Sequence, residues 1–254
     1  CVSSFGKCDY CRKGMYSHCT TGGWILGTTI DGTQAEYVRT PHADTSLYHI
    51  PANSDEEALV MLSDILPTGF ECGVLNGKVQ PGATVAIVGS GPIGLAALLT
   101  AQFYSPAQII MVDFDENRLE TASRFGATQI INAADGKAVE KIMQMTGGRG
   151  VDTAIEAVGV PASFVTCEDI VAPGGVIANI GVHGVKVDLH LEKLWEETED
   201  TVHLGVLDDE RALYLDKRTG RRRINISSRV GERQPIRSTG LGKALVLDDS
   251  EEGW

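Results

Sequence analysis

Residues 89–94 have the spacing with the most definite chemistry in this sequence. They are Gly-Ser-Gly-Pro-Ile-Gly, which matches G-x-G-x-x-G, and they lie between an apolar run and an apolar helical pattern. In such a turn Gly89 allows a tight bend, Gly91 lets backbone amides approach a diphosphate, and Gly94 lets the next helix pack closely on the strand. A helix that starts at Pro92 and Ile93 would direct its free N–H groups at the phosphate charge. The pattern predicts a dinucleotide site, and a plain glycine turn is the alternative.

An acidic residue lies where such a site would hold a sugar. Asp113 directly follows the next apolar run, Gln108–Val112. A carboxylate there can accept hydrogen bonds from the ribose hydroxyls and would repel a 2′-phosphate, so the pattern favours NAD over NADP. The alternative role for Asp113 is a helix N-cap.

Three of the six cysteines lie close together at a metal-ligand spacing. Two thiolates three positions apart can chelate one ion from a single turn, and structural zinc sites have four ligands. The residue three positions before Cys8 is Phe5, which cannot bind a metal, so Cys1 or His18 would have to complete the site. Reduced thiols without a metal are the alternative. The three cysteines are Cys8, Cys11 and Cys19.

The composition is that of an ordinary folded protein, with 254 residues, 43% of them hydrophobic and 22% charged. A net charge of -12 would repel a phosphate backbone on average, so no nucleic-acid partner is expected. No apolar run approaches the ~20 residues of a membrane helix, and no signal-peptide pattern is present. We therefore expect a cytoplasmic chain without a membrane partner.

A strand–helix alternation over residues 83–182 must position these groups. Val- and Ile-rich runs alternate with helical patterns, which is typical of a doubly wound parallel sheet. Cys72 and Cys167 fall in apolar helical patterns and are expected to be buried thiols. The predicted strands are Thr84–Val88, Gln108–Val112, Gln129–Ile131, Asp152–Glu156 and Gly175–Ile180, and the predicted helices are Ile93–Thr100, Asn117–Phe125 and Lys137–Met145.

The sequence pattern changes on both sides of this alternation. Asp31–Val38 predicts a turn and a short strand, and Pro51 is expected to open a helix. Thr201–Leu207 and Ala212–Leu215 predict a hairpin. The first of its strands is apolar, and we expect it to extend the edge of the parallel sheet beside Gly175–Ile180.

Residues 1–195 resemble the zinc-dependent medium-chain alcohol dehydrogenases, particularly the bacterial secondary-alcohol type. Several unrelated motifs occur in the family's order, which makes the resemblance specific. It implies an α/β fold, a doubly wound Rossmann sheet preceded by the remnant of a GroES-like β domain. The matching pieces are Gly6–Cys11 with Cys19, Gly32–Val38, Leu62–Gly69, Gly89–Gly94, Asp113, Gly126–Thr128, Gly150–Gly159 and Gly174–Gly184.

The resemblance also implies roles for individual residues. The family binds a structural zinc with four cysteines, of which three are matched here and Phe5 replaces the fourth. Asp64 matches a ligand of the catalytic zinc, whose cysteine and histidine ligands are expected before Cys1. The alternative for Asp64 is a carboxylate at a helix start. Backbone beside the nicotinamide in this family matches Val158, Gly159, Ile180 and Val182.

Residues 196–254 resemble the start of the effector-binding domain of IclR-type transcription regulators. Motifs around Tyr214, Ser228–Gly231 and Ser238–Leu245 carry this second resemblance. The chain is therefore expected to join two truncated parts. The domains would be 1–50, a remnant of the catalytic domain with the zinc lobe; 51–195, the NAD-binding domain; and 196–254, a β-hairpin-containing tail.

Three hypotheses for function follow. The first is an NAD-dependent oxidoreductase that transfers a hydride between an alcohol or ketone and NAD, here incomplete. The second is a dinucleotide-binding regulatory or sensor fusion without catalysis. The third is a recombination product that folds only in part. A homo-oligomer is compatible with the first.

Overall fold

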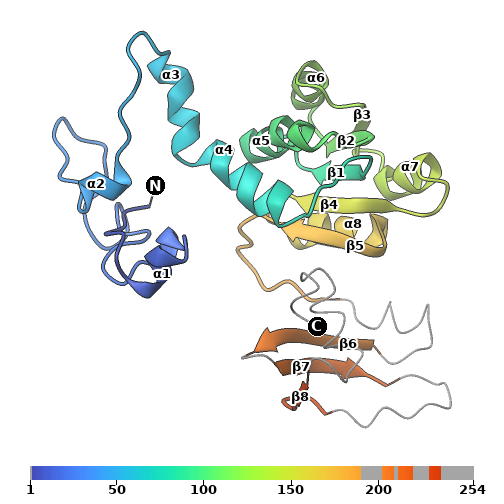
Figure 1. Cartoon of the computed structure of the whole chain (residues 1–254). Helices are drawn as coiled ribbons and strands as arrows, with labels where there is room; N and C mark the ends of the chain where they lie inside the picture. The colour runs from blue at the N-terminus through green and yellow to red at the C-terminus, as the bar shows by residue number, and fades with distance from the viewer. Residues whose placement is uncertain (1, 190–201, 209–210, 220–228, 236–254) are drawn as a thin grey trace. The chain divides into compact units, whose positions relative to one another are not determined.

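A parallel sheet of five strands, in the order β3-β2-β1-β4-β5, is the centre of the computed structural model (Figure 1). Four strands match the predicted ones to within one residue, because each is a short apolar run bounded by turn residues, whereas the fifth begins four residues before the predicted Gly175. Their bounds are β1 Thr84–Val88, β2 Gln108–Asp113, β3 Gln129–Asn132, β4 Val151–Glu156 and β5 Val171–Asn179.

The structure describes residues 2–189, 202–208, 211–219 and 229–235. The chain divides into two compact units, residues 1–186 and 187–254. The Rossmann-like sheet is in the first unit, and a small antiparallel sheet is in the second.

Helices follow the strands of the parallel sheet in alternation, as a doubly wound fold requires. Pro92 occupies the first turn of α5, where the ring removes an N–H that has no partner in the helix. Asp115 caps α6 by accepting from the backbone of Asn117 and Arg118. The helices are α5 Pro92–Ala101 with the 3-10 turn Gln102–Tyr104, α6 Glu116–Arg124, α7 Ala138–Met145 and α8 Pro161–Ile170.

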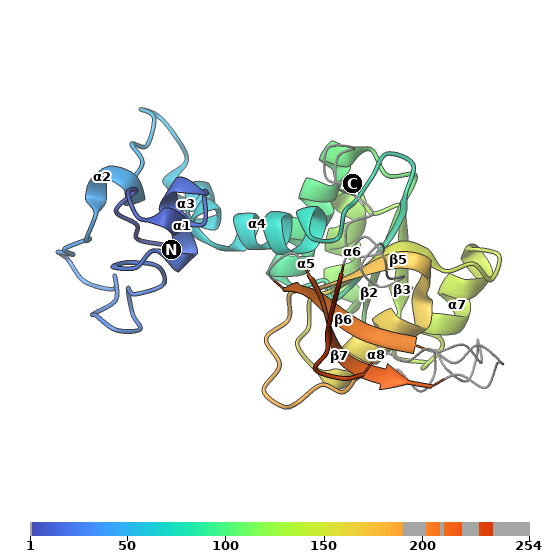
Figure 2. The ribbon, with the colours of Figure 1, turned by 60° about the horizontal axis from the view of Figure 1, so that its bottom comes forward.

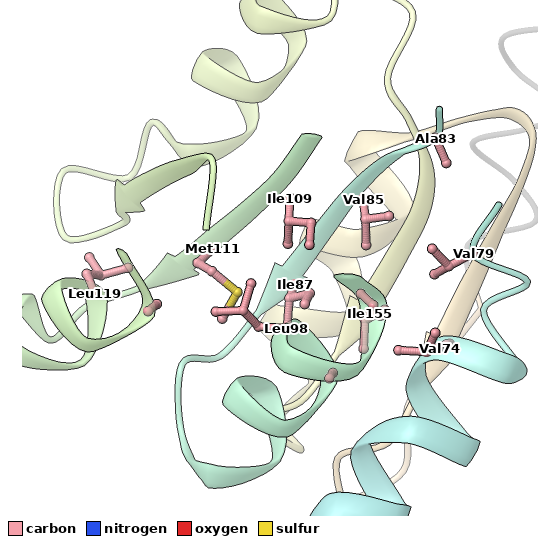
Figure 3. Packing of buried hydrophobic residues seen from close by; sticks show 14 residues of the cluster. Val74, Val79, Ala83, Val85, Ile87, Leu98, Ile109, Met111, Leu119 and Ile155 are labelled. Atoms are coloured by element: carbon pink, nitrogen blue, oxygen red, sulfur yellow. The ribbon is translucent and has the colours of Figure 1, made fainter. Parts of the chain in front are cut away.

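The sheet is buried on both faces, so successive residues of one strand enter two different cores. Ile87 and Val85 of β1 belong to a cluster with Leu98 of α5, and Leu119 of α6 joins the same cluster beside Met111 of β2, as Figure 3 shows. The other face is formed by Ala86 and Val88 of β1 with residues of α7 and α8. This two-sided burial explains why the strand sequences are continuously apolar.

A bent helical segment precedes the sheet. It consists of α3 Glu56–Leu59, the 3-10 turn Val60–Ser63, α4 Ile65–Thr68 and the π-helix Gly69–Leu75, which contacts α5 (Figure 2). The helix predicted to open at Pro51 begins only at Glu56, because Asp55 is the residue whose side chain caps it. Within the described residues no single helix is long and apolar enough to cross a membrane. Only Glu56–Ser63 and Ile65–Leu75, bent by 43°, meet that test as a pair, by length and composition.

The first fifty residues contain short helices and isolated bridges. The helices are α1 Asp9–Arg12, the 3-10 turn Tyr16–His18 and α2 Ala43–Ser46, and the bridges pair Ser3 with Gly23 and Leu26 with Ile30. The strand predicted at the end of Asp31–Val38 is wrong: no strand pairs there in the described part of the chain. Tyr37 is 91% exposed, so this stretch lacks the half-buried face that a strand needs.

The second unit holds the predicted hairpin. Strands β6 Val202–Asp208 and β7 Arg211–Arg218 pair antiparallel, and β8 Arg233–Pro235 adds a third strand. The expectation that the apolar run Thr201–Leu207 extends the parallel sheet is wrong, because β6 belongs to the sheet β6-β7-β8. Strands β6 and β7 follow one another in the sequence and pair antiparallel, as strands joined by a short connection can.

Candidate functional site

The predicted dinucleotide turn lies at the junction of β1 and α5. Gly89 has a φ of 105°, which favours glycine, and its N–H donates to the carbonyl of Val112 at 2.8 Å. A Cβ on Gly94 would collide with the carbonyl oxygen of Gly89, so only glycine lets α5 approach the turn this closely. A Cβ on Gly91 would meet no atom within 4 Å. The turn is therefore closed on the protein side and open at Gly91, the N-cap of α5.

Asp113 lies at the mouth of this turn. Its Oδ2 accepts from the backbone N–H of Ser90 at 2.7 Å. Its Oδ1 accepts from the N–H groups of Phe114 and Asp115 at 2.8 and 3.0 Å. These three donors fix the carboxylate at the carboxyl end of β2, beside the turn. Asp113 does not cap α6, because that role belongs to Asp115.

The glycine turn lies at the point where the strand order of the sheet reverses. β2 lies on one side of β1 and β4 on the other, so the strand order reverses between β1 and β4. Ligands of doubly wound sheets bind outside the carboxyl ends of the strands at such a point.

The residues predicted beside the nicotinamide follow β4 and β5 at the same edge. The loop after β4 carries Val158 and Gly159, and the loop after β5 carries Ile180 and Val182. A Cβ on Gly159 would lie 2.6 Å from the carbonyl oxygen of Val182, so the two loops touch. The Val182 side chain is 91% exposed and Val158 is half exposed, whereas Ile180 packs against the core.

Three buried side-chain atoms lack a hydrogen-bond partner within the described residues, and all three belong to this edge. They are Ser90 Oγ after β1, Glu156 Oε2 at the end of β4 and His183 Nδ1 after β5. Buried polar atoms are normally paired, and unpaired ones concentrate at functional sites. The sequence analysis did not identify Ser90, Glu156 or His183. The available signal was an acid, Glu156, at the end of an otherwise buried apolar strand.

The three cysteines of the predicted metal site converge. The Sγ atoms of Cys8, Cys11 and Cys19 all lie within 4.8 Å of one another, and those of Cys8 and Cys11 are 3.4 Å apart. Two ligands at zinc distance on a tetrahedral ion would be about 3.8 Å apart, so the spacing suits one ion. Cys11 and Cys19 are buried.

Backbone donors prepare two of these thiols for the thiolate form. The N–H of Cys11, with further backbone donors, lowers the pKa of Cys8 to about 6. Burial opposes ionisation of Cys19, but donation from the Phe5 N–H and other groups leaves its pKa below the ordinary value. Burial raises the pKa of Cys11. Thiolates are the form that binds metal.

The fourth ligand is not supplied by the described residues. His18 does not join the cluster; its ring packs against Tyr10 and its Nδ1 lies 3.0 Å from Ser17 Oγ. Phe5 contributes its backbone N–H to Cys19 and its ring to a contact with His42. Cys1 lies outside the described residues.

Asp64 lies at the start of α4 and is exposed. Its Oδ1 accepts from the Thr68 hydroxyl at 2.7 Å, and its backbone carbonyl accepts from the Thr68 N–H. Among the described residues, no further metal-binding side chain joins Asp64. The geometry is that of a helix-start carboxylate.

Of the two cysteines predicted to be buried, one is buried and the other is exposed. Cys167 is fully buried in α8, and burial raises its pKa. Cys72 is exposed, so its predicted burial is wrong. It lies on the π-helix, whose buried residues are Gly69, Gly73 and Val74.

Family models match three parts of the chain. A GroES-like alcohol dehydrogenase domain matches residues 1–52, and a zinc-binding dehydrogenase model matches residues 92–207. The C-terminal domain of bacterial IclR transcriptional regulators matches residues 179–253.

Several curated relatives are named as alcohol dehydrogenases. An alcohol dehydrogenase of Cupriavidus necator is 39% identical over 178 residues, which are 70% of this chain and 48% of the relative. An NADP-dependent isopropanol dehydrogenase of Thermoanaerobacter brockii is 37% identical over 68% of this chain and 49% of its own length. The chain thus spans about half the length of the curated relatives it matches.

Solved structures of alcohol dehydrogenases are also similar to this chain. Zinc-dependent alcohol dehydrogenase 2 from Streptococcus pneumonia, in its apo form, is 61% identical with a TM-score of 0.72. The match covers 77% of this chain and 55% of the other. An alcohol dehydrogenase from Thermus sp. ATN1 is 33% identical with a TM-score of 0.68, over 76% and 56%.

Proposed function

We propose that residues 1–195 belong to the zinc-dependent alcohol dehydrogenase family and that they bind NAD for hydride transfer between a small alcohol and its ketone. One observation carries the proposal: a glycine turn with an acid at its mouth, where the strand order of a parallel sheet reverses. Several relatives of this chain are named as alcohol dehydrogenases.

The residues at this edge suit a dinucleotide. The open space at Gly91 leaves room for a diphosphate beside the N–H groups of α5. The ordered carboxylate of Asp113 has acceptor capacity left for ribose hydroxyls. The exposed apolar side chains of Val158 and Val182 offer a surface for a flat ring. A bound nicotinamide supplies the hydride acceptor or donor.

The chain's own residues provide position and charge. Gly89 and Gly94 keep the turn in the one shape that brings α5 to the diphosphate. Asp113 selects for an unphosphorylated ribose, because its charge would lie beside a 2′-phosphate. Among relatives, both Thermoanaerobacter brockii and Clostridium beijerinckii have enzymes named NADP-dependent. The preference for NAD is therefore a property of this chain to be measured.

Residues for two zinc sites, one structural and one catalytic, are proposed. Cys8, Cys11 and Cys19 would hold a structural zinc, which three converging thiols suit. Asp64 is proposed as a catalytic-zinc ligand from the family pattern alone. The described residues do not complete a catalytic site around Asp64, since such sites use three protein ligands. No reaction step is assigned to that metal.

We also propose domain boundaries and a cellular location. We place the boundaries at 1–50, 51–195 and 196–254; the match to residues 1–52 supports the first boundary, and the second lies within the overlap of the matches to residues 92–207 and 179–253. A cytoplasmic location is supported by three converging free thiols, which persist in reducing compartments.

Replacing Asp113 with Asn tests the cofactor assignment. The amide oxygen can still accept from Ser90, while the amide nitrogen then faces the N–H groups of Phe114 and Asp115, so the variant loses the charge together with one acceptor. We expect NADH binding, followed by fluorescence titration, to weaken about tenfold and the preference over NADPH to shrink. Asp115→Asn, which removes the same charge two positions away, is the matched control. An unchanged ratio of NADH to NADPH affinity in Asp113→Asn would contradict the assignment.

A second candidate is a dinucleotide-binding regulator without catalysis. The match of residues 179–253 to an IclR regulator domain favours it. This candidate requires NADH binding with no alcohol-dependent NADH formation in the presence of zinc. Alcohol oxidation by the full chain with added zinc would exclude it.

A further inference from the structure

A buried acid and a buried imidazole meet at the carboxyl edge of the parallel sheet. Glu156, the last residue of β4, is fully buried, and His183, after β5, has 11% of its side chain exposed. Glu156 Oε2 and His183 Nε2 are 3.4 Å apart. A buried carboxylate is costly unless it is paired and hydrogen-bonded, so this pair requires a reason.

The other oxygen of Glu156 organises the loop that follows its strand. Oε1 accepts from the backbone N–H groups of Val158 and Gly159, each at 2.9 Å, and from the Ser163 hydroxyl at 2.5 Å. Two donors come from the loop and one from the start of α8. One carboxylate oxygen thereby fixes the path of the backbone that carries Val158 and Gly159.

The backbone of Glu156 fixes the neighbouring loop as well. Its carbonyl accepts from the N–H groups of Ile180 and Gly181 at 2.8 and 3.2 Å. A Cβ on Gly181 would collide with Glu156 Oε2 and with the N–H of Gly159, so glycine is needed for this contact. Both loops are therefore built around Glu156.

The surroundings of His183 define which nitrogen carries a proton. Nε2 faces Asn179 Oδ1 at 2.9 Å and Glu156 Oε2 at 3.4 Å, and both oxygens are acceptors. Nε2 must therefore be the protonated nitrogen in the neutral ring. The ring edge also packs against Phe164 of α8. His183 thus joins the loop after β5 to the acid that orders the loop after β4.

We propose that Glu156 and His183 are positioning residues that hold these two loops in the shape required by the nicotinamide end of the dinucleotide. This inference rests on the proposed function. The adenosine end depends instead on the glycine turn and Asp113, which the pair does not touch. The pair should therefore affect mainly the nicotinamide half of the ligand, because the loop after β4 reaches the glycine turn only where Ala157 and Val158 lie beside Gly89.

Two ligands separate the halves of the site. NADH occupies both halves, whereas ADP-ribose lacks the nicotinamide. In the full chain, His183→Phe keeps a ring against Phe164 and removes both nitrogens. We expect NADH to bind about tenfold more weakly and ADP-ribose to bind within about twofold of the wild type. His49→Phe, which removes an exposed imidazole, is the matched control.

Glu156→Gln is an independent test variant, and together with His183→Phe it forms a double-mutant cycle. It keeps the shape of the acid, and we expect the same selective loss of NADH binding. If His183 acts through Glu156, then His183→Phe should cost much less, under about threefold, when made in Glu156→Gln. Additive losses would overturn the pairing.

The remaining outcomes distinguish this inference from the proposed function. Equal losses of NADH and ADP-ribose in both variants, or unchanged NADH binding in both, would overturn the positioning role while leaving the dinucleotide site intact. A wild-type chain that binds neither ligand would overturn the proposed function and this inference with it.

Discussion

At the residue scale, two glycines of one turn have different tasks. Gly94 faces the backbone of Gly89, whereas Gly91 faces open space. The first glycine is required by the fold, and the second is required only if a ligand approaches. Substitution by alanine can therefore separate folding from binding.

We expect Gly91→Ala to fold normally and to bind NADH at least tenfold more weakly, because its φ of -73° suits alanine and the new methyl group would occupy the diphosphate space. Gly94→Ala should instead lower the thermal midpoint, since the turn must move to admit the methyl group. Thermal unfolding and NADH titration of both variants check this. Equal NADH affinity in Gly91→Ala and wild type would contradict the diphosphate assignment.

The thiol cluster gives a second prediction at this scale. We expect the purified chain to hold about one zinc per chain and Cys11→Ser to lose it, since two thiolates bind zinc far more weakly than three. Elemental analysis measures the metal content. Cys72→Ser, which changes an exposed thiol outside the cluster, should retain the zinc. Zinc retained equally in both variants would place the ion elsewhere.

The sequence alone predicted those site residues that act within one turn or within a short stretch of chain. Gly89, Gly94 and the three cysteines are examples. Glu156 and His183 were missed because their contact joins two loops through the tertiary fold. Nothing in the neighbouring sequence of His183 distinguishes it from an ordinary exposed histidine.

At the element scale, the predicted strands and helices of the parallel sheet lie within one residue of their observed starts, except that β5 begins four residues earlier than predicted. A strand buried on both faces is a distinct apolar run, and β1 was predicted with its observed bounds. The helix near Pro51 begins later because capping by Asp55, and not proline, determines its start. The parallel sheet was predicted correctly, whereas the placement of β6 was wrong because pairing partners depend on chain connection as well as apolar character.

The start of β4 is tied to its neighbours by an acid. Asp152 accepts from Arg149 at 2.7 Å and from the N–H of Thr84, the first residue of β1, at 2.8 Å. The hydrogen bonds from Arg149 hold the pKa of Asp152 below its ordinary value of 3.8. A lowered carboxylate pKa stabilises the fold above the ordinary value, and this stabilisation is lost as the pH falls through the lower folded pKa.

We therefore expect the free energy of unfolding of the wild type to fall more steeply from pH 5 toward pH 2 than that of Asp152→Asn. The difference should stay below about 1 kcal/mol, because both side chains are more than one-third exposed and solvent screens the pair. Denaturant titrations across this pH range provide the measurement. Parallel curves for the two proteins would show that the pair does not contribute.

At the scale of the whole molecule, the chain has two units with separate sheets. The proposed dinucleotide residues all belong to residues 1–186. A ligand that binds only a native unit stabilises that unit, by about 2.7 kcal/mol at a concentration of 100 times its Kd.

Calorimetry of the full chain should therefore show NADH raising the midpoint of one transition by several degrees and leaving any transition of residues 187–254 unchanged. Sodium sulfate at matched ionic strength is a control for nonspecific stabilisation by anions. A shift of every transition together would show that the two units unfold as one.

Strand β5 stands last in the strand order of the parallel sheet. Within the described residues β5 pairs with β4 along one side only, and its other side offers a row of amide and carbonyl groups over a strand of nine residues. Such an edge is a template on which a second polypeptide can continue the ladder. At high protein concentration, during storage or refolding, we therefore expect aggregation to begin with pairing of another chain along β5.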